Sequence, residues 1–149
     1  MDTIRFPTEL REFLKLLGDH HVEYLLIGGY AVGYYGYPRA TGDMDIWIAI
    51  DQSNARKVIA ALAEFGFGDT DMPSDLFLGP DQIVRMGNTP LRIEILTTIS
   101  GVNFAEAYPE RVVDEIDGIA VSIISREHLK TNKLASGRPK DLGDLDNLP

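Results

Sequence analysis

The fold is decided by residues 24–50, whose sequence is YLLIGGYAVGYYGYPRATGDMDIWIAI. The apolar run 22–27 ends at a glycine pair, which predicts a short buried strand followed by a turn. In residues 43–50 two aspartates alternate with apolar side chains before the run becomes wholly apolar. Asp43 and Asp45 are therefore expected on one face of a second strand, with apolar residues on the other face.

The rest of the chain supplies helices and hairpins around these two strands. Apolar residues at i, i+3, i+4 and i+7 predict an amphipathic helix over residues 8–18. The further expected elements are a short helix 30–36, a loop 37–42, a helix after the candidate caps Asp51 and Ser53, a loop 67–80, strands 82–86 and 91–97 joined by a turn at Asn88, strands 112–115 and 119–124, and helices 126–136 and 140–148. This mixture predicts an α+β fold with a mixed central β-sheet flanked by helices, and with C-terminal helices.

Length and composition are those of one soluble domain, 1–149. The chain is 44% hydrophobic and 25% charged, with a net charge of −9 and no cysteine. No apolar run approaches the roughly 18 residues of a membrane span, and no secretory signal is visible. We therefore expect a cytoplasmic protein with no membrane partner. An acidic chain also binds nucleic acid poorly unless a local basic patch is present.

Asp43 and Asp45 are candidate metal ligands. On one strand face their Cβ atoms are roughly 6–7 Å apart. This spacing suits a hard divalent cation such as Mg²⁺, which takes one or two carboxylates and completes its coordination with water and phosphate oxygens. The alternative is a solvated Asp-x-Asp pair. Aspartate is disfavoured in apolar strands, so two of them at the start of one favour the metal site.

The glycine pair and a later acid have two interpretations each. Gly28-Gly29 is either a turn that needs positive φ or a turn whose backbone N–H groups face a phosphate. There is no Walker lysine and no G-x-G-x-x-G motif, so a P-loop or dinucleotide-binding domain is unsupported. In the strand 91–97, alternation places Glu94 on one face with Arg92 and Leu96. Glu94 is either a solvated residue or a third site carboxylate.

These motifs together resemble a known family. Gly28-Gly29, a short helix, the run 39–45 with sequence RATGDMD, and an acid on a later strand are similar to the nucleotidyltransferase superfamily of DNA polymerase beta. The resemblance is to its small bacterial members, the minimal and the toxin-type nucleotidyltransferases. The C-terminal run 137–145, GRPKDLGDL, also resembles a run common near the end of such proteins.

The resemblance implies roles for the motif residues. Gly28 and Gly29 would contact the triphosphate through backbone amides. Asp43, Asp45 and Glu94 would be the catalytic, metal-binding carboxylates, holding two Mg²⁺ ions. Many members have Asp at the third position, so Glu94 is a departure from the pattern. Two ions can stabilise the attacking and leaving oxygens of an in-line displacement.

Basic residues supply further candidates for nucleotide binding. Arg126, Lys130 and Lys133 lie at i, i+4 and i+7 of the helix 126–136. Residues 126–140, which include this basic stripe, contain five basic residues and one acid. They are either a solvated face or a cationic wall for phosphate, and in the second case Lys133 is a nucleotide-binding residue. Arg39 and Thr41, just before the aspartates, are candidates for the same role.

Two acids of the C-terminal run are expected to serve structure. Asp141 would place negative charge at a helix N-terminus, and Asp144 would pair with Lys140 at i, i+4. Neither is expected in the catalytic site.

The resulting hypothesis is an Mg²⁺-dependent nucleotidyltransferase that moves NMP from an NTP to a hydroxyl. The acceptor is a protein, a tRNA or a small molecule, and a tRNA acceptor is the only nucleic acid expected. The resemblance to toxin-type members also implies a role as the toxin of a toxin–antitoxin pair, and a partner protein or a homodimer would complete the cleft. The alternative is a non-catalytic nucleotide-binding or interaction subunit that retains the fold.

Overall fold

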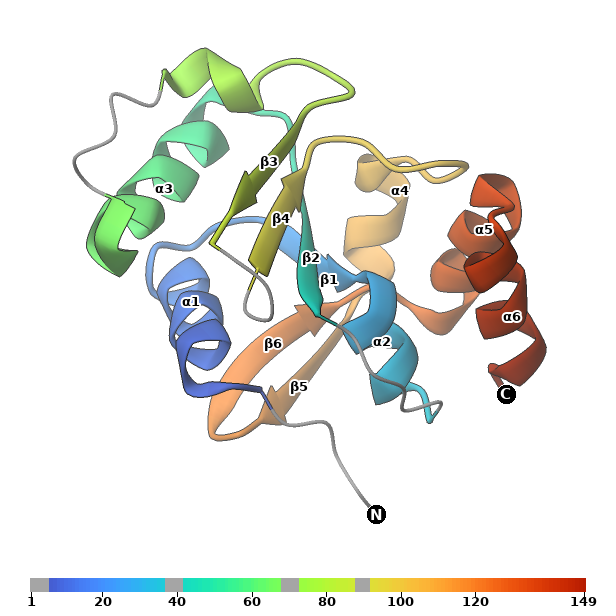
Figure 1. Ribbon diagram of the computed structural model, residues 1–149. Helices are drawn as coiled ribbons and strands as arrows, with labels where there is room; N and C mark the ends of the chain where they lie inside the picture. The colour runs from blue at the N-terminus through green and yellow to red at the C-terminus, as the bar shows by residue number, and fades with distance from the viewer. Residues whose placement is uncertain (1–5, 37–41, 68–72, 88–91) are drawn as a thin grey trace.

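The computed structural model describes residues 6–36, 42–67, 73–87 and 92–149 (Figure 1). The strands are β1 Tyr24–Ile27, β2 Asp43–Ile48, β3 Ile83–Met86, β4 Arg92–Leu96, β5 Val112–Ile116 and β6 Ile119–Ile123. The helices are α1 Thr8–Asp19, α2 Gly28–Tyr34, α3 Gln52–Leu62, α4 Phe104–Ala107, α5 Arg126–Ser136 and α6 Pro139–Asn147. Short turns of π-helix at Ala63–Phe67 and of 3₁₀-helix at Ser74–Phe77 and Tyr108–Glu110 complete the described elements.

The strands in the described part of the chain form one six-stranded mixed sheet in the order β3-β4-β2-β1-β6-β5. β2 runs antiparallel to β1 and parallel to β4, and β1 runs parallel to β6. The pairs β3–β4 and β5–β6 are antiparallel hairpins. The second hairpin turns at Asp117 and Gly118, which both have positive φ, as a tight two-residue turn requires. The α+β prediction is confirmed.

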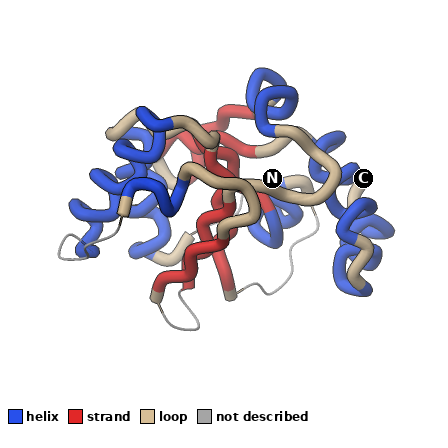
Figure 2. Tube along the Cα trace, turned by 90° about the horizontal axis from the view of Figure 1, so that it is seen from above, coloured by secondary structure: helices blue, strands red, loops and turns tan. Residues whose placement is uncertain are grey.

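Helices cover both faces of the sheet, and Figure 2 shows strands between two groups of helices. α1 and α3 lie on one face, where the predicted stripe of α1 is fully buried. Asp51 caps α3 as expected, because its side chain accepts a hydrogen bond from the backbone N–H of Asn54. α2, α4, α5 and α6 lie on the other face (Figure 1). Acidic side chains of β2 and β4 line a cleft on this side together with residues of α2, α5 and α6.

Two predicted boundaries were wrong. The helix expected over 30–36 begins at Gly28, because the glycine pair opens the helix rather than preceding it. The loop expected over 67–80 contains a 3₁₀ turn that buries Phe77, since one apolar anchor suffices to fold a short turn onto the core. Most of the loop expected over 37–42, and the turn at Asn88, lie outside the described residues. No helix in the described ranges is long and apolar enough to cross a membrane.

Candidate active site

The pairing of β2 with β4 brings the candidate acids together. In this parallel pair Asp45 lies opposite Glu94, and Asp43 lies opposite Arg92. Residues opposite each other on neighbouring strands point to the same face of a sheet. The face predicted for Asp43 and Asp45 is therefore the face of Glu94 as well. Of the two interpretations left open for Glu94, the register supports a place beside the aspartates.

The glycine pair is held directly against this face. Ile27, the last residue of β1, pairs with Asp45, so the chain turns into α2 beside that carboxylate. Gly28 has a φ of +67°, and a Cβ atom at this position would collide with Oδ2 of Asp45. Any residue with a side chain is therefore disfavoured at position 28 for two reasons, the positive φ and the lack of space for a Cβ atom. The turn needs glycine because it brings the backbone close to the acid.

Two arginines balance two of the three acids. Arg92 donates to both oxygens of Asp43, from Nε at 3.1 Å and from Nη2 at 2.9 Å. Arg85, on the edge strand β3, donates from Nε to Oε1 of Glu94 at 2.7 Å. Both ion pairs are partly exposed, so they are weak and can open to water or to a ligand. The sequence did not predict a role for Arg85, because its contact with Glu94 depends on the pairing of β3 with β4.

Asp45 is the one of these three acids that forms no ion pair with an arginine in the described parts of the chain. Its Oδ1 is buried and has no hydrogen-bond partner in the described parts of the chain. The pKa of Asp45 is raised to about 7, first by burial and then by the negative charge of Glu94, a side-chain hydrogen bond with Glu94 and the charge of Asp43, while the positive charge of Lys140 lowers it. A buried carboxylate oxygen with no donor is the kind of group that a bound cation satisfies.

We expect Asp45 to make stability fall with rising pH. Its folded pKa of about 7 lies above the ordinary 3.8, so the folded protein holds a proton that the unfolded chain has released. The contribution is complete below about pH 4 and is lost as pH rises through 7. Asp45→Asn should therefore be more stable than the parent at pH 8 by at least about 1 kcal/mol.

The measurement is urea unfolding of both proteins from pH 4.5 to 8.5 in the presence of a chelator. Asp19→Asn is the control, because Asp19 is an exposed acid that pairs with Lys15 outside the site. A parent and an Asp45→Asn variant with parallel pH profiles would contradict the expectation.

A cleft of about 810 Å³ opens over the acids. Its lining includes Gly28, Gly29, Asp43, Asp45, Glu94 and Lys133 from the predicted site. It also includes cationic and polar side chains that are not among the predicted site residues: Arg85, Ser100, Asn132, Ser136, Arg138 and Lys140. Arg39 and Thr41 lie outside the described residues. Within the described ranges, no three His, Asp or Glu side chains are preassembled around one point as metal ligands.

The environment of Lys133 is neither of the two that the basic stripe predicted, which were solvent and phosphate. It is buried, and its Nζ lies 3.1 Å from Oδ1 of Asp141 and 3.1 Å from Oδ2 of Asp144. The expected pairing of Asp144 with Lys140 missed this contact, because helix periodicity considers only partners on the same helix. The expectation that Asp141 and Asp144 serve structure agrees with these ion pairs. A nucleotide contact by Lys133 stays a prediction.

Arg138 is a cleft residue that the sequence places among the five basic residues of 126–140 but does not single out. It lies between α5 and α6, and its signal was the run 137–145 noted above. That run supports the family resemblance, and its Arg138 belongs to the basic segment 126–140. Helix periodicity could not predict where the side chain of Arg138 points, because Arg138 lies between the end of α5 and the start of α6.

The fold and the cluster of acids beside a glycine turn define a nucleotidyltransferase-like protein. The chain belongs to the family described as "Nucleotidyl transferase of unknown function (DUF2204)", whose model matches residues 7–149. No curated protein matches the chain at a significant level.

Several solved structures have a similar fold. TM1012 of Thermotoga maritima, described as a "putative nucleotidyltransferase", has a TM-score of 0.63 and 18% identity, over 92% of this chain and 88% of its own. An antigenic nucleotidyltransferase-like protein from Paracoccidioides brasiliensis has a TM-score of 0.57 and 16% identity, over 94% and 74%. The lincosamide antibiotic adenylyltransferase LnuA, solved with lincomycin, has a TM-score of 0.56 and 20% identity, over 99% and 98%. At these identities the likeness shows the fold.

Proposed function

We propose that this protein is an Mg²⁺-dependent nucleotidyltransferase that moves NMP from an NTP to a hydroxyl acceptor. The observation that carries the proposal is the register of β2 and β4, which sets Asp45 opposite Glu94 beside the turn at Gly28. A binding subunit that had lost its chemistry would have no need for three acids on one face. Their mutual repulsion costs stability unless a cation enters.

The residues fit a divalent cation. The donor set is all carboxylate, which Mg²⁺ prefers, and Oδ1 of Asp45 is buried without a partner among the described residues. Asp43 and Asp45 would hold the ion that accompanies the triphosphate, and Glu94 would complete the site of a second. When bound, the ions offset the charge of the NTP and lower the pKa of the acceptor hydroxyl. The chain itself supplies the backbone N–H groups at Gly28 and Gly29 toward the phosphates.

The acceptor is a small molecule, a protein hydroxyl or a tRNA end. LnuA, whose name gives a lincosamide antibiotic as its substrate, is a fold relative covered over 98% of its length. That supports a small-molecule acceptor for a chain of this size. The net charge of −9 favours a cationic small molecule or a protein over RNA. A toxin role, a partner protein or a homodimer, and a cytoplasmic location belong to the same proposal.

Nucleotide and Mg²⁺ together should raise the melting temperature. A ligand at about 100 times its dissociation constant adds about 2.7 kcal/mol of stability. The experiment combines melting curves for each of the four NTPs, with and without Mg²⁺, with transfer of label from α-labelled NTPs into a cell lysate. Stabilisation that needs both components, together with a labelled product, is the expected result.

Two other results have defined meanings. Stabilisation by NTP and Mg²⁺ with no labelled product from any NTP would favour the non-catalytic subunit. An unchanged melting temperature with every NTP at millimolar concentration would contradict a nucleotide site of either kind.

A further inference from the structure

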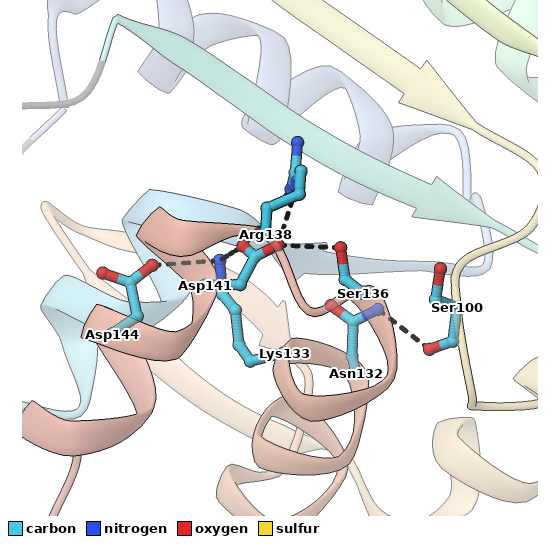
Figure 3. A network of polar contacts seen from close by, with 7 residues as sticks. All are labelled: Ser100, Asn132, Lys133, Ser136, Arg138, Asp141 and Asp144. Carbon is cyan, nitrogen blue, oxygen red and sulfur yellow. Dashed lines mark hydrogen bonds and ion pairs between the residues drawn. The ribbon is translucent and has the colours of Figure 1, made fainter.

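The turn between α5 and α6 places one cation at the mouth of the cleft. Arg138 lines the cleft, and 62% of its side chain is exposed. The negative charges of Asp45 and Glu94 act on its guanidinium and, after its hydrogen bond with Asp141, help to raise its pKa. In Figure 3 the side chain extends from the turn toward β2. Arg138 thus faces the acids without being bonded to them.

Asp141 holds Arg138 in this position. Nε of Arg138 donates to Oδ2 of Asp141 at 2.7 Å, and Nη2 donates to Oδ1 at 3.3 Å. This two-bond fork fixes the plane of the guanidinium as well as its place. Asp141 is itself fully buried, although it belongs to a helix at the surface. An acid buried at such a site needs several donors to stay ionised.

Those donors come from α5. Ser136 donates its hydroxyl to Oδ2 of Asp141 at 2.7 Å, and Lys133 donates from Nζ to Oδ1 at 3.1 Å (Figure 3). Burial alone raises the pKa of Asp141, but the hydrogen bonds from Arg138, Ser136 and Lys133 outweigh it and hold the pKa well below the usual range. The carboxylate is therefore a fixed, charged anchor for Arg138.

The other arginines of the cleft are placed differently. Arg85 and Arg92 are bonded to Glu94 and Asp43, which are the expected metal-binding acids. Arg138 donates two of its five N–H groups to Asp141, which is not one of the expected metal-binding acids. Its other N–H groups are available for a ligand in the cleft that Arg138 lines. An anchored, partly exposed guanidinium is the preferred group for a phosphate, because it pairs with two oxygens at once.

We propose that Arg138 binds the phosphate chain of the nucleotide, and that Asp141 is the positioning residue that presents it. The inference rests on the proposed function and adds a specific group to it. Lys133 then acts indirectly, because it holds Asp141 in place and does not itself contact the phosphates. The C-terminal hairpin of α5 and α6 becomes part of the nucleotide site.

The test is calorimetric titration of the parent, Arg138→Gln and Arg138→Lys with each NTP in Mg²⁺, and with the matching nucleosides. Arg138→Gln should weaken NTP binding about tenfold or more and leave nucleoside binding within twofold, with a smaller loss at 0.5 M salt. Arg138→Lys keeps the charge but cannot form the fork with Asp141, so it should lose most of the same affinity. Arg56→Gln is the control, because Arg56 is an exposed arginine of α3 outside the cleft.

The outcomes separate the inference from the function on which it rests. If the parent binds no NTP, the proposed function fails. If the parent binds NTP and Arg138→Gln binds it equally well, the function stands and the inference is overturned. If Arg138→Lys binds as the parent does, charge alone suffices and Asp141 is not a positioning residue. Asp141 keeps Ser136 and Lys133 as donors in both variants, and a melting curve of each variant checks that it is folded before the titration.

Discussion

Glu94→Gln is expected to cut nucleotidyl transfer by about 10²–10⁴-fold while leaving the NTP bound. The substitution keeps the size and the hydrogen-bonding capacity of the side chain but removes its charge. Glu94 comes from β4, opposite Asp45, and we assign it to the ion that activates the acceptor hydroxyl. Loss of that ion affects the chemical step more than binding, because Asp43 and Asp45 keep the ion that accompanies the triphosphate.

The measurements are labelled transfer to the acceptor once it is found, and titration of NTP with Mg²⁺. Asp43→Asn should damage both binding and transfer, which distinguishes the two roles. Glu127→Gln is the matched control, since Glu127 is an exposed acid of α5 outside the cleft. Full transfer activity in Glu94→Gln would remove Glu94 from the site. Asp81 would be the next candidate, because it also lines the cleft.

Lys133→Ala is expected to cost about 3–5 kcal/mol of folding free energy. The lysine is buried between the carboxylates of Asp141 and Asp144, and its side chain is 4% exposed. Its removal leaves two buried acids with one donor fewer each. Asp141 keeps Arg138 and Ser136 as donors, but the ion pairs that join the buried lysine of α5 to the two acids of α6 are lost. The hairpin that carries Arg138 should loosen with it.

Urea unfolding at pH 7 without nucleotide measures this effect. Lys130→Ala is the control on the same helix, because Lys130 is not buried and lies outside the cleft lining of the described residues. It should change stability by no more than about 0.5 kcal/mol. Equal midpoints for Lys133→Ala and Lys130→Ala would mean that the buried ion pairs contribute nothing to folding.

Much of the fold follows from local pattern. Three features depend only on neighbours in the sequence: the spacing of three and four residues between the apolar side chains of α1, the alternation at the start of β2, and the turn at Asp117-Gly118. The chemistry of Asp43 and Asp45 is local in the same sense, since two residues on one strand share a face whatever the strand pairs with. The sequence therefore determined the α+β class and the first two acids of the site.

The remaining parts of the site depend on contacts between distant segments. Alternation placed Glu94 on a face, but only the parallel pairing of β4 with β2 decided that the face was that of Asp45. The same holds for Arg85, whose partner lies on another strand. Neither fact has a local signature, because strand order and register depend on how the whole chain packs.

The basic stripe shows the difference most clearly. The helical period predicted that Lys133 shares a face with Lys130, and left only solvent or phosphate as its partner. The tertiary structure placed Asp141 and Asp144 against that position, so the charge of Lys133 is paired with buried acids, while Arg138 lines the cleft with its side chain partly exposed. Period specifies which side chains lie together on one helix. The helix that packs against them decides which charges are buried as pairs and which remain free to meet a ligand.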